Sequence, residues 1–157
     1  LSLLRVQEYT GQVRRGYFVE GFSGAQFIRR DDFGGITARL LSPVSELLWI
    51  HAADPMQPWG KLLPHRPELA FANLPGTAVA LRGGLPVMLF EKQGKGLRVF
   101  DPSCLKEALQ LFTQEYRQGR IYTDRKRIVV KEYPAEAADV LSESGFVREM
   151  LDYTLYR

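Results

Sequence analysis

Two glycine-rich turns in the middle of the chain limit how the residues around them can fold. Arg82-Gly83-Gly84 separates the apolar runs 77–81 and 85–91, and residues 92–96 (KQGKG) separate the second run from residues 97–100. Short apolar runs bounded by glycine turns are typical of strands that are joined as hairpins. Because strands joined by hairpins are antiparallel, the sequence predicts three antiparallel strands between residues 77 and 100.

The elements on either side of these strands are short and of mixed type. Strands and helices do not alternate regularly, which argues against a parallel α/β sheet. We therefore expect an α+β fold, in which a mainly antiparallel sheet is curled into a partial β-barrel with three or four flanking helices. The other predicted elements are helices at 2–9, 36–41, 103–118 and 134–144, strands at 47–53 and 127–133, a last strand or hairpin at 146–156, and a tight hairpin over 13–19 with Gly16 at its middle.

Composition places the chain among ordinary globular proteins. Of its 157 residues, 45% are hydrophobic and 25% are charged. No run reaches the roughly 20 apolar residues of a membrane-spanning helix, and the N-terminus lacks the layout of a signal peptide, so we expect no membrane association. A single cysteine, Cys104, excludes an intrachain disulfide, and we expect a cytoplasmic protein.

The positive charge is concentrated in one quarter of the chain. The net charge is +3 overall, but it is +1 over residues 1–91, +6 over 92–131 and −4 over 132–157. A basic segment of this kind is able to follow a phosphate backbone, because each contact releases counterions and adds affinity that depends on salt. The alternative is a solvated surface covered by acidic neighbours, and composition alone leaves both open.

Catalytic and metal-binding patterns are weak. His51 and Asp54 stand three residues apart, and on a strand they would face opposite sides unless a turn intervenes. Cys104 lies at the first turn of a predicted helix, where the dipole would lower its pKa, but no histidine can be placed beside it. Two histidines and one cysteine without ligand spacing are too few for a metal site. We expect no catalytic residue, cofactor or metal in this chain, and a small hydrolase using Cys104 is the alternative.

Four aromatic residues lie beside basic or glycine-rich stretches, namely Tyr17, Trp49, Trp59 and Tyr122. An exposed aromatic ring beside cations stacks on unpaired bases. Trp49 lies in an apolar run and is predicted to be part of the core. Trp59, between Pro58 and Gly60, is the stacking candidate, and a buried position beneath the proline-rich loop is its alternative.

Four motifs occur in order along the chain: RRGYFVEGFSGAQF (14–27), HAADPMQPWGKLLP (51–64), GGLPVMLF (83–90) and SGFVREM (144–150). The series resembles the C-terminal, DEAD/H-associated region of large helicase-related (Lhr-type) superfamily-2 DEAD/DEAH-box helicases, over most of the chain. The first residue is leucine within a predicted helix, which is typical of a segment cut from a longer protein.

The resemblance implies the domain organisation and the activity of the parent protein. Residues 1–20 would be the tail of a winged-helix module, and residues 21–157 a barrel-like domain that completes the strand channel. The family uses ATP hydrolysis to move along single-stranded nucleic acid, and it is linked to DNA repair. ATP and Mg²⁺ would bind in motor domains outside this chain, since no GxxxxGK[ST] motif occurs here.

We therefore expect an accessory helicase domain that guides or clamps single-stranded DNA or RNA, with the motor domains of the same polypeptide as its other partner. The alternative is a structural or protein-interaction module that supports the motor domains without touching nucleic acid. The predicted nucleic-acid contacts are Arg14, Arg15, Lys92, Lys95, Arg125, Lys126 and Arg127 for the backbone and Trp59 for a base.

Overall fold

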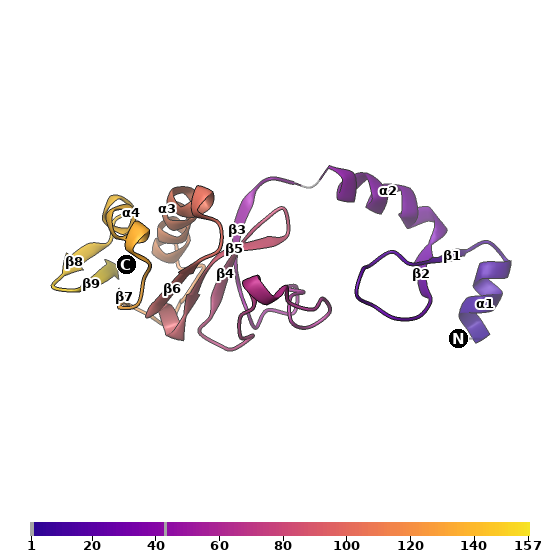
Figure 1. The fold of residues 1–157 in the computed structure, drawn as a ribbon, viewed down its shortest axis with the longest axis horizontal. Coiled ribbons are helices and arrows are strands. Elements are labelled where there is room, and N and C mark those ends of the chain that lie inside the picture. Colours follow the sequence, from indigo (N-terminus) through magenta and orange to yellow (C-terminus); the bar gives the residue numbers. More distant parts are fainter. Residues whose placement is uncertain (1, 43) are drawn as a thin grey trace. The chain divides into compact units, whose positions relative to one another are not determined.

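The computed structural model describes residues 2–42 and 44–157, which form two compact units (Figure 1). The first unit comprises residues 1–44 and the second residues 45–157. The boundary predicted from the sequence, between residues 20 and 21, falls inside the first unit. Each unit is described by itself below.

The first unit is built on one two-stranded hairpin between two helices. Its elements are α1 (Ser2–Tyr9), β1 (Val13–Gly16), β2 (Gln26–Arg29) and α2 (Arg30–Leu41). The strands pair antiparallel, with Val13 opposite Arg29 and Gly16 opposite Gln26. The predicted tight hairpin centred on Gly16 is therefore wrong, because Gly16 ends the first strand and residues 17–25 form a long loop. We call residues 17–25 the wing loop.

Helix α2 begins earlier than its apolar pattern indicates. From the sequence we expect this helix over residues 36–41, because Gly34 and Gly35 are poor helix formers and obscure its start. In the structure it begins at Arg30, and Asp31 and Asp32 occupy its first turn. Carboxylates at this position favour the helix, since they face the positive end of its dipole.

The second unit contains an antiparallel four-stranded sheet with the order β3-β4-β5-β6. The strands are β3 (Leu47–His51), β4 (Ala78–Arg82), β5 (Leu85–Glu91) and β6 (Gly96–Val99). Consecutive strands of β4, β5 and β6 pair through the two glycine-rich turns, so the predicted hairpins are confirmed.

Alternate residues of β4 face two different apolar clusters. Ala78 and Ala80 pack in the cluster that contains helix α3 (Leu105–Arg117). Val79 and Leu81 pack on the opposite face, where Trp59 and Phe71 cover the sheet. Each face of the sheet thus has its own cover.

The predicted partial β-barrel is wrong. A barrel would require the sheet to curl until its edge strands pair, whereas β3 and β6 stay at the two edges of an open sheet. The physical reason is the two-sided cover, because a sheet enclosed between a helix and a loop leaves no interior to close around. The α+β class, the antiparallel pairing and the four α-helices of the described residues agree with the prediction.

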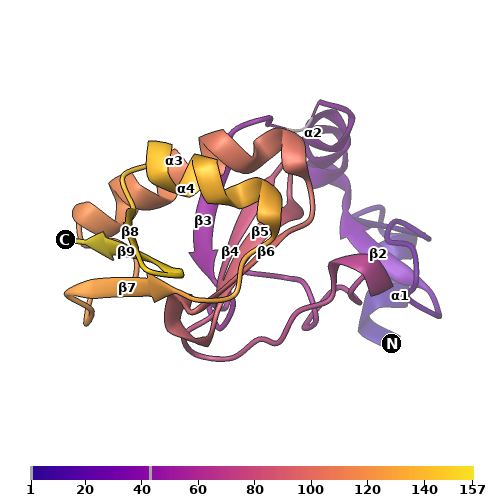
Figure 2. The same ribbon diagram turned by 60° about the vertical axis from the view of Figure 1, so that its left-hand side comes forward.

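The last part of the chain forms a separate three-stranded sheet with the order β7-β9-β8. Helices α3 and α4 lie side by side, and α3 packs across β3 (Figure 2). Within this core the ring of Phe146 stacks on those of Phe90 and Phe112, beside the fully buried Tyr116. The remaining elements are β7 (Arg127–Val130), α4 (Ala138–Glu143), β8 (Val147–Glu149) and β9 (Asp152–Tyr156), with short 3₁₀ turns at Pro67–Leu69, Lys92–Gly94, Pro102–Cys104 and Ala135–Ala137.

None of the helices in the described residues has the length and apolar character needed to cross a membrane.

Two turn glycines give a matched test of the contact between the turn at residues 92–96 and strand β7. A Cβ on Gly94 would lie 2.4 Å from Ile128 Cγ2, and Gly94 has a φ of +89°. Gly84 has a similar φ of +82° and open space around it. We expect Gly94→Ala to lower the free energy of unfolding by about 3 kcal/mol and Gly84→Ala by about 1 kcal/mol. Urea denaturation measures both, and equal losses would show that the contact with Ile128 contributes nothing.

Candidate nucleic-acid interface

The structure joins the turn at residues 92–95, which we call the basic turn, to the end of strand β7. The backbone N–H groups of Lys131 and Glu132 donate to Lys95 O at 2.8 and 3.0 Å. Leu97 N donates to Glu132 O at 2.7 Å, and Lys92 Nζ lies 2.9 Å from the carboxylate of Glu132. The basic turn is therefore fixed by both backbone and side-chain contacts.

A cavity of about 340 Å³ lies where the basic turn approaches residues 122–125. Gln93 of the basic turn and Arg125 both line it, so the two basic stretches predicted from the sequence share one cavity. His51 and Tyr122 form another part of the wall, with their rings 5.7 Å apart in an edge-on arrangement. We call this hollow the β3–β7 cavity.

Two residues of this wall have a strained backbone. Gln93 has a φ of +61° and Tyr122 a φ of +47°, in the region that side chains other than glycine rarely adopt. Gln93 N donates to Gly76 O at 2.8 Å, and the Tyr122 hydroxyl donates to the same carbonyl at 2.8 Å. Burial raises the pKa of Tyr122, so its hydroxyl stays protonated and keeps this hydrogen bond at neutral pH. Strain of this kind persists where the surroundings fix it, and it is concentrated at functional sites.

The segment from Arg125 to Arg127, which we call the basic segment, is held from behind. The Arg157 guanidinium lies 4.7 Å from the ring centroid of Tyr116 and donates to the carbonyls of Thr123 and Tyr122 at 2.8 and 2.9 Å. The Tyr116 hydroxyl donates to Arg125 O at 3.0 Å. These backbone contacts position the basic segment and leave its side chains outside.

The predicted cations of the second unit differ in how far they are neutralised. The pKa of Lys92 is raised, first of all by its hydrogen bond to Glu132, and Arg125 lies 3.5 Å from Asp124. Within residues 2–42 and 44–157, no carboxylate comes within 4 Å of the side-chain nitrogens of Lys95, Lys126 or Arg127. The pKa of Glu149 is lowered first by its hydrogen bonds to Tyr156 and Thr154 and then by the nearby charge of Arg127. Lys95 and Lys126 are therefore the stronger candidates for phosphate contact, and Arg127 follows them.

Arg14 and Arg15 lie on strand β1 of the first unit. The Arg14 guanidinium stacks 4.2 Å from the ring centroid of Phe33, and Arg15 Nε lies 3.6 Å from a carboxylate oxygen of Glu8. Both side chains are exposed. The structure therefore distributes the predicted backbone contacts over the two units.

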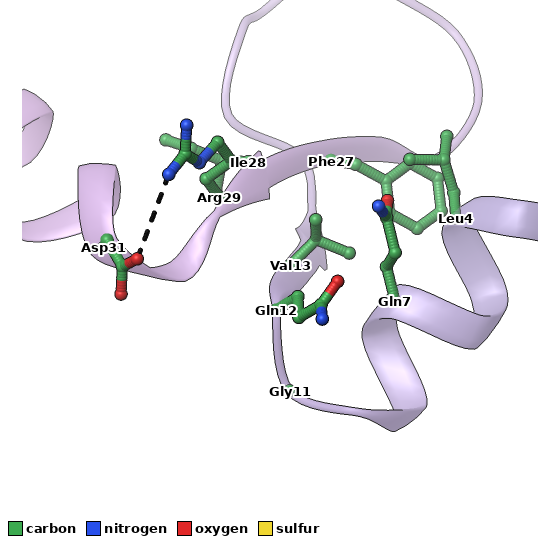
Figure 3. A pocket seen from close by; sticks show the side chains of 9 residues that line it. All are labelled: Leu4, Gln7, Gly11, Gln12, Val13, Phe27, Ile28, Arg29 and Asp31. Carbon is green, nitrogen blue, oxygen red and sulfur yellow. Dashed lines mark ion pairs between the residues drawn. The ribbon is translucent and has the colours of Figure 1, made fainter.

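A hollow of about 770 Å³ in the first unit opens between α1 and the hairpin (Figure 3). Its wall is mixed: the apolar side chains of Leu4, Val13, Phe27 and Ile28 lie beside the polar ones of Gln7 and Gln12, and Arg29 lies 4.0 Å from Asp31. Val13 is the only buried residue among those described in this unit. Arg29, the cation of this wall, is paired with Asp31 and Asp32, so within the described part of the unit the hollow offers no free cation to a phosphate backbone and is no part of the candidate interface.

Trp59 does not offer a ring face to a base. Its side chain is only 8% exposed, and its indole Nε1 donates to Gly84 O at 2.8 Å. The fully buried Gln57 fixes it further, since the Gln57 side chain donates to Trp59 O at 3.0 Å. The buried position that the sequence left open is the observed one, and the stacking role predicted for Trp59 has no support in this geometry.

Tyr17 has the exposed ring that Trp59 lacks. Of the four aromatics considered, Trp49 is partly buried with its Nε1 donating to Ala108 O, and Tyr122 is buried. Tyr17 is 84% exposed, at the start of the wing loop. The signal that would have singled it out is its position two residues after Arg15 in the RRGY motif.

The catalytic candidates are not assembled into a site. Asp54 accepts a hydrogen bond from Met56 N at 2.8 Å and so closes its own turn, while His51 faces Tyr122. Cys104 is fully buried, and its thiol donates to Asp101 Oδ2 at 3.3 Å. No group of three His, Cys, Asp or Glu side chains suited to a metal ion occurs in the part of the chain that the structure describes.

Comparison with known proteins identifies the relatives of this chain. The family model described as "Large helicase-related protein, winged-helix domain" matches residues 1–38. The chain is 32% identical to the "Lhr helicase/uracil glycosylase" of Escherichia coli (strain K12) over 163 residues, which cover 92% of this chain. It belongs to the large helicase-related (Lhr) family. The "Lhr helicase/ probable uracil glycosylase" of Mycolicibacterium smegmatis is 30% identical over 134 residues, or 76% of this chain.

The chain spans about a tenth of the length of these two Lhr proteins, 10% of the first and 9% of the second. The resemblance stated from the sequence motifs is confirmed, and the Lhr winged-helix match contains α1, both strands of the hairpin and most of α2. The assignment of residues 1–20 to a winged-helix tail and of 21–157 to a second domain stays a prediction.

The burial of the Cys104 thiol allows us to predict how fast it reacts with an alkylating agent. Burial raises the pKa of Cys104, and the hydrogen bond to Asp101 raises it further, which opposes the activation expected from the helix dipole. We expect alkylation of the native chain at pH 8 to be at least about tenfold slower than alkylation in denaturing urea. Iodoacetamide labelling followed by mass spectrometry measures both rates, and fast native labelling would restore the Cys104 hydrolase hypothesis.

Proposed function

We propose that this Lhr region is an accessory part of an ATP-dependent helicase and that it guides the single strand of DNA or RNA during translocation and unwinding. ATP and Mg²⁺ would act in motor domains elsewhere in the same polypeptide, which would also be its protein partner. A cytoplasmic location and a role in DNA repair belong to the same proposal.

The observation that carries the proposal is the meeting of two basic stretches at one cavity. The basic turn and the basic segment are some thirty residues apart in sequence, yet Gln93 and Arg125 line the same wall. The same two stretches carry Lys95, Lys126 and Arg127, which have exposed side chains. A surface with several exposed cations holds a phosphate backbone without reading its sequence, as a moving strand requires.

The test is binding of a fluorescently labelled single strand to the whole chain at several salt concentrations, followed by anisotropy. Each phosphate contact contributes about −0.7 to the slope of log affinity against log salt for a single strand. Charge reversal of Arg125, Lys126 and Arg127 together should weaken binding at least about tenfold and reduce the slope by about two.

A matched pair of single variants separates local contact from net charge. Lys126→Glu and Lys106→Glu change the net charge equally, and both lysines are exposed, but Lys106 lies on α3 and is paired with Glu143 at 2.9 Å. The proposal expects a loss of affinity for Lys126→Glu and little change for Lys106→Glu. Equal losses would show that net charge, and not the basic segment, controls binding and would contradict the proposed contact. No binding by the unaltered chain at low salt would favour the alternative, a module that supports the motor domains without touching nucleic acid.

The names of the two relatives add a second candidate function, uracil glycosylase activity. We propose it for this chain because His51 and Asp124 line the β3–β7 cavity, which has the size of a small-molecule site. Glycosylases take the target base out of the stack and into a pocket. The test is release of uracil from a uracil-containing single strand by this chain. Release that is lost in Asp124→Asn would support the candidate, and no release by the unaltered chain would remove it.

A further inference from the structure

Tyr17 is a large aromatic side chain held out in solvent at a place where the backbone around it is fixed. Exposed aromatics on mobile loops are common and carry no meaning by themselves, so what matters is how the wing loop is held. The Gln26 side chain accepts hydrogen bonds from Phe18 N and Val19 N, each at 2.7 Å, and donates to Val19 O at 2.9 Å. One side chain at the start of β2 thus fixes the backbone on the C-terminal side of Tyr17.

The residue next to Tyr17 turns the other way. The Phe18 ring packs edge-on against Phe33 of α2, with the ring centroids 6.0 Å apart. Its ring lies over Gly16, where a Cβ would come within 2.8 Å of it. Because Phe18 is folded back onto the unit and the backbone is fixed, Tyr17 is directed away from it and stays 84% exposed.

The surroundings of Tyr17 are basic on the strand that leads to it. Arg15 precedes Tyr17 by two residues, about 6.6 Å along an extended chain. Its side chain is exposed and its Nε lies 3.6 Å from Glu8, so a phosphate would compete with that carboxylate, while Arg14 is anchored on Phe33. Beyond Tyr17 the loop continues with the exposed apolar side chains of Val19 and Phe22. A cation followed at this spacing by an exposed ring is the combination that binds one phosphate and stacks one base.

We propose that Tyr17 stacks on an unpaired base of the bound strand, with Arg15 on the neighbouring phosphate. This inference rests on the proposed function, because it requires that the chain contacts nucleic acid. It adds a residue that the basic turn and the basic segment do not supply, namely a ring that binds the base itself. Stacking tolerates any base, so the contact is compatible with a strand that moves.

The experiment uses the whole chain and a single strand in which one base is 5-iodouracil, which crosslinks on irradiation to an aromatic ring stacked against it. We expect a crosslink at Tyr17, located by mass spectrometry. We expect Tyr17→Ala to weaken strand binding about fivefold to a hundredfold and Tyr17→Phe to stay within about twofold of the unaltered chain.

Tyr9 provides the matched control. It is 92% exposed on α1 of the same unit, so Tyr9→Ala removes an equally accessible ring before the hairpin begins. A loss in Tyr17→Ala with none in Tyr9→Ala supports the inference. Strand binding that is unchanged in Tyr17→Ala, with crosslinks elsewhere, overturns it and leaves the proposed function standing. Failure of the unaltered chain to bind at low salt overturns both.

Discussion

The close approach of Gly94 to Ile128 is the contact on which the proposed interface depends. It lets the basic turn lie against strand β7, where the turn is held by the carbonyl of Lys95 and the carboxylate of Glu132. Backbone hydrogen bonds between residues 95–97 and 131–132 hold the same two segments together. The cavity lined by Gln93 and Arg125 lies where these two segments meet.

In both units a packed aromatic side chain fixes the backbone of a segment that we propose contacts nucleic acid. In the second unit, Arg157 stacks on Tyr116, and together they fix the backbone that presents Arg125 to Arg127. In the first unit, Phe18 folds onto Phe33 and leaves Tyr17 outside. In each case apolar packing sets the backbone, and the charged or exposed side chains next to it cost little to arrange because the scaffold is already ordered.

Local signals predicted the elements well and their assembly poorly. The turns at residues 82–84 and 92–96 contain the glycines that hairpins need, so β4, β5 and β6 could be placed from sequence. The partial barrel could not be judged, because curvature depends on what covers each face, and Trp59 comes to cover one face only through long-range contacts. The wing loop was predicted wrongly for the same reason. Glycine is typical of turns, and only the structure shows that the Phe18 ring lies over Gly16. For the interface, the candidate cations could be named from the sequence. Which aromatic ring is free to stack on a base, Trp59 or Tyr17, could be judged only from their exposure in the structure.

Amide hydrogen exchange of the whole chain, with and without a saturating single strand, tests the central claim most directly. We expect slower exchange in the bound state at residues 92–96 and 122–127, with no change in α4 or in residues 64–74. Strand binding that slows exchange only outside the basic turn and the basic segment would contradict it, and so would the absence of any change at a strand concentration where anisotropy shows saturation.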